Sequence, residues 1–122
     1  MSYVVYKLIH FFGIVTIVSA LAARSMHTIS GGSSAISQPG RWLAIAHGIG
    51  MVLVLIGGFG MLARIGVLHD GLPGWVHLKL LVWVLAGAAL AAASRRADLA
   101  PAVLLALPLL VTFAAAIALY KP

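Results

Sequence analysis

The chain has 122 residues, of which 63% are hydrophobic and 8% are charged, and its net charge is +6. Soluble domains carry about 25% charged residues, so this chain lacks the polar surface that would cover a water-soluble globule. It contains no cysteine, which excludes disulfides, thiolate catalysis, iron–sulfur clusters and cysteine zinc sites. The basic residues stand singly or in pairs at the ends of apolar runs, and this placement favours lipid headgroups over nucleic acid.

Four apolar runs, each long enough for a membrane-spanning helix, follow one another along the chain. The Ser- and Gly-rich segment from Ser25 to Gly40 is typical of a loop, and the other two connections are short polar turns. In lipid, helices satisfy their own backbone hydrogen bonds. We therefore predict an all-α fold, an integral membrane four-helix bundle with antiparallel up-down topology, as one domain over residues 1–122. The predicted helices cover residues 3–24, 41–64, 74–94 and 98–120.

The distribution of Arg and Lys between the connections predicts an orientation. The first and third connections hold Arg24, Arg41, Arg95 and Arg96. The opposite side holds Arg64 and Lys121. The positive-inside rule then places the first and third loops in the cytoplasm of a bacterial inner (plasma) membrane. The expected partners are the lipid bilayer and a homo-oligomer or larger membrane complex, but not nucleic acid.

Several ionisable side chains fall inside the predicted spans, where each costs at least about 2.5 kcal/mol at the bilayer centre and commonly marks function. In an antiparallel bundle, the first and third helices start at the same membrane face. One half of the membrane therefore gathers Lys7, His10, Arg64, His77 and Lys79. His47 belongs to the other half.

Helical spacing groups these residues further. Lys7 and His10 are three residues apart and share a face. Trp75, Lys79 and Trp83 are four residues apart and form one stripe, which can cradle a flat aromatic ligand. The alternative is that Trp75 anchors the helix at the interface while Lys79 reaches toward the headgroups.

The second predicted helix is rich in glycine, and Gly50 and Gly57 lie on one face because they are seven residues apart. Small residues let membrane helices approach closely. They also leave room for a planar macrocycle, which is the second interpretation of this pattern.

Neutral histidine is a good axial ligand for haem iron, and helix bundles commonly hold cofactors between facing helices. His10, with a second ligand at a similar depth, is the best candidate. The alternative for each intramembrane histidine, and the first choice for His47, is a structural hydrogen bond. Lys7 and Arg64 can pair with haem propionates or with lipid phosphates.

Two segments resemble the HemJ-type protoporphyrinogen oxidases, which are small helical membrane proteins. These are the start of the chain, with Lys7-Leu8-Ile9-His10, and the stretch Gly74-Trp75-Val76-His77-Leu78-Lys79. The resemblance implies haem b bound through His10 and Lys79, and removal of six electrons and six protons from protoporphyrinogen IX. Ile17 to Ala20 stand where that family has a Trp-x-x-Gly.

Three hypotheses follow. The first is a haem b- or porphyrin-binding membrane protein that oxidises protoporphyrinogen IX or passes electrons. In it, His10 and Lys79 are metal ligands and His77 is a competing ligand. The second is a non-catalytic accessory subunit that packs in a larger respiratory or photosynthetic complex. The third is a small transporter or metal-handling protein, since SirB-like and copper-resistance CopD-like families share the four-helix outline.

Overall fold

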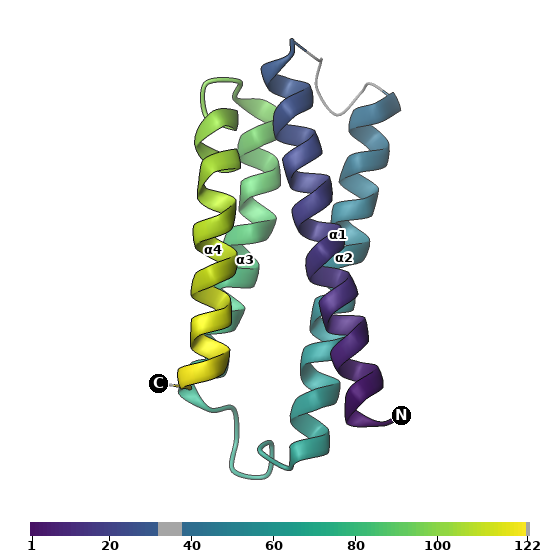
Figure 1. Ribbon diagram of the computed structural model, residues 1–122, viewed down its shortest axis with the longest axis vertical. Coiled ribbons are helices and arrows are strands. Elements are labelled where there is room, and N and C mark those ends of the chain that lie inside the picture. The colour runs from purple at the N-terminus through teal and green to yellow at the C-terminus, as the bar shows by residue number, and fades with distance from the viewer. Residues whose placement is uncertain (32–37, 122) are drawn as a thin grey trace.

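The computed structural model describes residues 1–31 and 38–121, and within them every regular element is an α-helix. The predicted all-α class and the number of four helices are confirmed for these residues. Figure 1 shows the four helices lying side by side, with both chain ends near the connection between α2 and α3. The helices are α1 (Tyr3–Ile29), α2 (Gln38–Ile65), α3 (Gly74–Arg95) and α4 (Ala100–Tyr120).

The first helix runs five residues past its predicted end at residue 24. Ser25 and Thr28 remain helical because their hydroxyl groups donate to carbonyl oxygens one turn back, Leu21 O at 2.9 Å and Arg24 O at 3.1 Å. The part of the predicted loop from residue 25 to residue 29 is therefore helix. Residues 32–37 of that loop lie outside the described residues, and α2 begins at Gln38 rather than at residue 41.

The closest helix pair is α1 with α2, and glycine is the reason. A Cβ at Gly57 would lie 2.5 Å from the backbone nitrogen of His10, and one at Gly50 would lie 3.0 Å from the carbonyl oxygen of Gly13. A Cβ at Gly60 would collide with the ring of Tyr6. The packing interpretation of the glycines holds for these positions, whereas Gly48 faces open space.

The remaining contacts join this pair to α3 and α4. One apolar cluster contains Ile17, Met51 and Ala86, and a second contains Leu21, Ala93 and Leu107. In the described residues, α2 meets α3 over a short stretch and does not contact α4. Helix α1 therefore packs closely on α2 and also contacts both α3 and α4, while space remains between α2 and α4.

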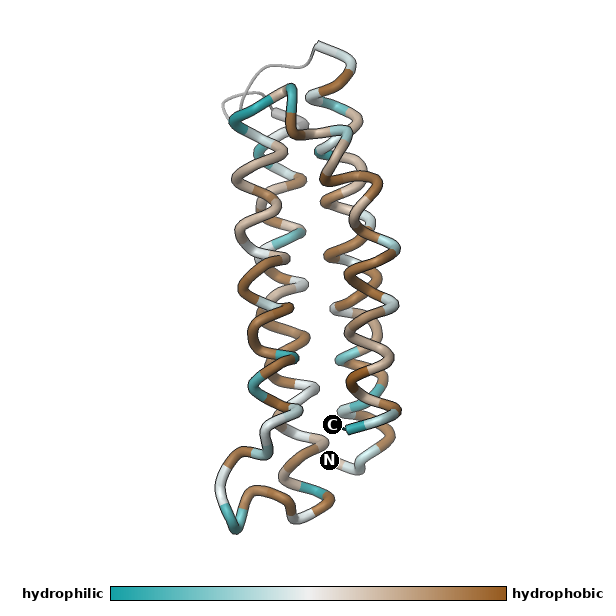
Figure 2. Tube along the Cα trace, turned by 90° about the vertical axis from the view of Figure 1, so that its left-hand side faces the viewer, coloured by the Kyte–Doolittle hydropathy of each residue, from teal (hydrophilic) through white to brown (hydrophobic). Residues whose placement is uncertain are grey.

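All four helices are long and apolar enough to cross a membrane. Most of their large apolar side chains point outward, and α4 is the most exposed helix, with Leu105, Leu109 and Leu119 each at least 74% exposed. In Figure 2, hydrophobic residues dominate the middle of the helices, and hydrophilic ones gather toward the two ends. This distribution suggests a multi-pass membrane protein in contact with lipid.

Candidate functional site

A cavity of about 800 Å³ lies between the helix pairs, toward the end of the molecule that holds both chain termini. Side chains from all four helices line it, and most of them are apolar. Pockets for cofactors and other small molecules occupy about 300–1,000 Å³. We call it the four-helix cavity. Its polar lining consists of Tyr3, Lys7, His10, Trp75, Lys79, Trp83 and Lys121.

His10 reaches this cavity from α1 in one defined tautomer. Its Nδ1 lies 2.8 Å from the carbonyl oxygen of Val54 on α2. Since a carbonyl oxygen only accepts hydrogen bonds, Nδ1 carries the proton and donates, and Nε2 keeps a free lone pair. Metal-binding histidines commonly have this arrangement, because the hydrogen bond fixes the ring and makes the other nitrogen more basic.

The glycines of α2 make this contact possible. The Cβ atom of His10 would be 2.7 Å from a Cβ at Gly57, and its ring would be 3.5 Å from a Cβ at Gly58. A Cβ at Gly57 would therefore collide with α1, whereas one at Gly58 would make an ordinary van der Waals contact with the imidazole. The glycine pattern of α2 and the placement of His10 are therefore one structural feature.

Lys79 approaches the same cavity from α3 and is partly buried. The structure thus brings His10 and Lys79, predicted from separate helices, to one cavity. The neutral form of an amine carries a lone pair, whereas the ammonium form can only donate hydrogen bonds.

The Trp75–Lys79–Trp83 stripe also lines the cavity with all three of its members. Trp83 Nε1 donates to the carbonyl oxygen of Met51 at 2.9 Å, which fixes its indole across the contact between α2 and α3. The Trp75 ring lies 5.7 Å from the Nζ of Lys121. The stripe therefore presents two restrained indoles along one wall of the cavity.

Three predicted site residues do not line the cavity: His77, Arg64 and His47. His77 is exposed, and its Nδ1 lies 3.1 Å from the carbonyl oxygen of Pro73 in the preceding turn. Two residues correspond to about 200° around a helix, so His77 points away from the cavity that Lys79 lines. Arg64 is seven residues after Gly57 and therefore lies on the face of α2 that meets α1. At the height of Arg64, however, α1 has only just begun, so no part of α1 covers this side chain and it is exposed.

His47 lies in the other half of the bundle, as its position in the sequence predicts. It is 2% exposed and is buried near the backbone of Ala86 on α3. Its Nε2 is buried without a hydrogen-bond partner among the described residues. His47 joins α2 to α3 and does not line the four-helix cavity.

The structure gives Lys121 and Arg24 positions that their places in the sequence did not predict. Lys121 counted only as a topology signal, yet it lines the cavity. Arg24 is 1% exposed, and its Nε donates to Ser94 Oγ at 2.9 Å. The signal for Arg24 was its place at the end of an apolar run, which also fits an exposed loop residue.

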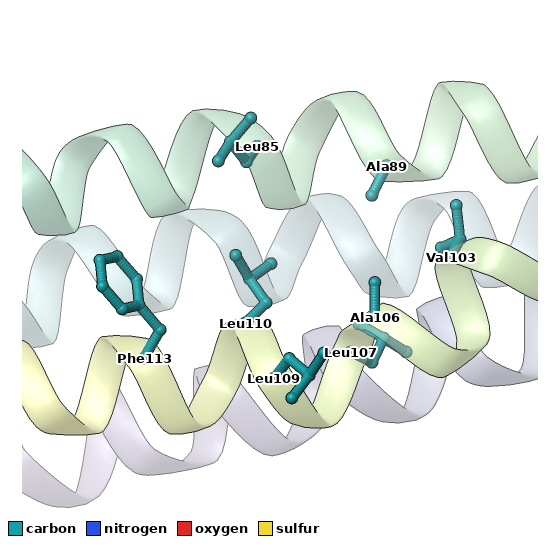
Figure 3. A pocket seen from close by; sticks show the side chains of 8 residues that line it. All are labelled: Leu85, Ala89, Val103, Ala106, Leu107, Leu109, Leu110 and Phe113. Atoms are coloured by element: carbon teal, nitrogen blue, oxygen red, sulfur yellow. The ribbon is translucent and has the colours of Figure 1, made fainter.

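A second cavity, of about 420 Å³, lies between α3 and α4 (Figure 3). Its lining side chains are all apolar and include Leu85, Leu110 and Phe113. It offers no polar group to orient a ligand. Among residues 1–31 and 38–121, no three His, Cys, Asp or Glu side chains are close enough together to hold a metal ion.

Comparison with known protein families, curated proteins and solved structures finds no match for this chain.

Proposed function

We propose that this chain is a membrane protein that binds haem b or a related porphyrin in the four-helix cavity. The observation that carries the proposal is His10, which lines the cavity with its Nδ1 proton committed to Val54 and its Nε2 lone pair free. Lys79 shares the cavity and supplies a second nitrogen. In a bilayer the four helices would cross in alternating directions, with the first and third connections in the bacterial cytoplasm.

The residues of the cavity fit such a group in size and chemistry. The volume of about 800 Å³ suits a macrocycle, and the walls are mostly apolar. Trp75 and Trp83 offer aromatic faces, which prefer offset or edge-on contact with another aromatic ring. His10 would hold the metal through Nε2, and Lys79 would hold it or poise the site. The group itself would supply electron-transfer chemistry.

The tasks of the protein side chains are ligation, orientation and exclusion of water. Val54 orients the imidazole through its carbonyl, and Gly57 opposite His10 lets α1 approach the backbone of α2. Oxidation of protoporphyrinogen IX to protoporphyrin IX, which the resemblance to the HemJ type implies, is the activity to test first. It releases six electrons and six protons, so the assay must include an electron acceptor.

The test is an absorption spectrum of the purified protein after titration with haem. We expect wild type to shift the Soret band relative to that of free haem. This shift should be smaller in Lys79→Ala and absent in His10→Ala. His77→Ala is the matched control, because His77 lies two residues from Lys79 but outside the cavity. A wild-type spectrum identical to that of free haem would refute the proposal.

The alternative function is that of an accessory subunit in a larger membrane complex. The outward apolar side chains of α4 favour it, since such a surface can meet either lipid or a partner helix. Co-purification of a stoichiometric partner after mild solubilisation, together with no haem binding, would favour this role. A stable homo-oligomer that binds haem would count against it.

A further inference from the structure

Three lysines from three parts of the chain line the four-helix cavity: Lys7 on α1, Lys79 on α3 and Lys121 after α4. Among residues 1–31 and 38–121, no acidic side chain lines it. In the described part of the chain, the salt bridge is between Arg96 and Asp98, which lie in the turn between α3 and α4 at the other end. The cavity therefore gathers three amines, and the described side chains that line it include no carboxylate to balance them.

Lys121 has a backbone conformation that directs it to this cavity. It ends α4 with φ 47° and ψ 55°, in the left-handed region that side-chain-bearing residues seldom adopt. Its N–H donates to Ile117 O at 2.9 Å, which closes the helix. Its Nζ lies 5.7 Å from the Trp75 ring, within the range of a cation–π contact. The last lysine thus turns back over the aromatic wall.

The three lysines differ in exposure. Lys79 is partly buried, whereas Lys7 and Lys121 are exposed. The cavity thus has an inner part with a histidine and a lysine, and a mouth with two solvated cations. A molecule that complements both parts has a flat apolar body and an anionic edge. Two carboxylates on that edge would match the two mouth lysines in charge.

We propose that the ligand of the four-helix cavity is an amphipathic dicarboxylate, a tetrapyrrole whose carboxylates contact Lys7 and Lys121. This inference rests on the proposed function and adds which end of the ligand faces the mouth. The macrocycle lies between Trp75 and the apolar walls, and His10 and Lys79 are left for the metal. An anionic phospholipid would also bring negative charge to the two mouth lysines. Its acyl chains are flexible, however, and lack a flat ring that could pack on the restrained indoles.

The experiment compares metal-free protoporphyrin IX with its dimethyl ester, in a neutral detergent, by porphyrin fluorescence. Esterification removes both charges and keeps the ring. We expect wild type to bind the diacid about tenfold more tightly than the diester, as charge-assisted contacts at a partly solvated site allow. Lys7→Gln and Lys121→Gln each reduce this preference, and the double variant abolishes it.

Arg64→Gln is the matched control, because Arg64 is an exposed cation of the same end of the bundle that does not line the cavity. It should keep the wild-type preference. Equal affinity of wild type for diacid and diester would overturn the inference, and so would a preference that the double variant retains. A further arm adds phosphatidylglycerol or phosphatidylcholine. Lysine-dependent binding of phosphatidylglycerol without any preference for the diacid would assign the lysines to lipid headgroups.

Because metal-free protoporphyrin cannot be ligated by His10, its binding tests the lysine contacts independently of the proposed ligation. Lysine-dependent binding of the diacid, with no shifted Soret band from haem, would refute ligation and support the role of the lysines. A shifted haem band that depends on His10, with no preference between diacid and diester, would support ligation and refute the role of the lysines. Failure to bind any porphyrin would refute both.

Discussion

His10 Nδ1 and the carbonyl oxygen of Val54 are 2.8 Å apart, and this contact joins α1 to α2 inside the four-helix cavity. It sets the protonation of the imidazole, because the carbonyl can only accept. We expect His10 to be neutral with its proton on Nδ1. Nitrogen NMR of protein labelled at histidine should show this tautomer, and His10→Ala identifies the signal. A proton on Nε2 would contradict the assignment and remove the Nε2 lone pair that the proposed ligation needs.

The glycine at position 57 sets how closely α1 approaches α2. In Gly57→Ala the new Cβ would lie 2.5 Å from the His10 backbone nitrogen, so the helices must separate. Overpacking of this kind costs about 1–3 kcal/mol. We expect a loss of that size in unfolding free energy, measured by denaturant titration in detergent, and weaker haem binding because His10 moves.

Gly48→Ala provides the control for that substitution, since nothing lies within 4 Å of a Cβ at position 48. Replacing a mid-helix glycine by alanine is normally stabilising by about 0.5–1 kcal/mol. Equal effects of the two substitutions would show that helix propensity alone, rather than the contact between α1 and α2, accounts for the glycines.

Hydropathy and periodicity predicted the four helices, because a run of about 20 apolar residues has few other solutions in lipid. They also grouped His10 with Lys79, since depth follows from helical rise. They did not distinguish Lys79 from His77, because that requires knowing which face of α3 meets the bundle. The position of Lys121 depends on a left-handed backbone, which the sequence Tyr-Lys-Pro does not specify.

The end of α1 was missed for a related reason. Ser and Thr favour loops because their hydroxyls compete for backbone groups, but here the same hydroxyls bond back within the helix. That choice depends on burial against α3, which a single segment does not reveal. The extension places Arg24 about 8 Å inside the helix end and makes it part of the interior.

The pair Arg96 and Asp98 predicts a pH dependence in the turn between α3 and α4. Arg96 Nη2 lies 2.7 Å from Asp98 Oδ2, and this hydrogen bond lowers the pKa of Asp98 below its usual range. The folded protein then binds fewer protons than the unfolded chain, so the stabilisation is present above the unfolded pKa of about 3.9 and is lost as the pH falls through the folded pKa.

Asp98→Asn should therefore reduce the loss of stability on acidification below about pH 4. The measurement is the unfolding midpoint as a function of pH, and the effect should be small because both side chains are exposed. Arg96→Gln should flatten the profile in the same way. A profile unchanged in both variants would show that the pair does not persist in solution.

Arg24 offers the sharpest test of the interior near the other end of the bundle. Its Nε donates to Ser94 Oγ, but Nη1 and Nη2 are buried and have no hydrogen-bond partner among residues 1–31 and 38–121. A buried charge without a counter-ion is costly, and replacing buried charges by apolar side chains of similar volume is often neutral or stabilising by about 1–4 kcal/mol. We expect Arg24→Met to raise the unfolding free energy by about 1 kcal/mol or more.

The exposed Arg95 provides the control, since Arg95→Met should change stability by less than about 0.5 kcal/mol. A large destabilisation by Arg24→Met alone would instead mean that the guanidinium has a counter-charge in the membrane, and titration with anionic lipid would then restore wild type but not the variant.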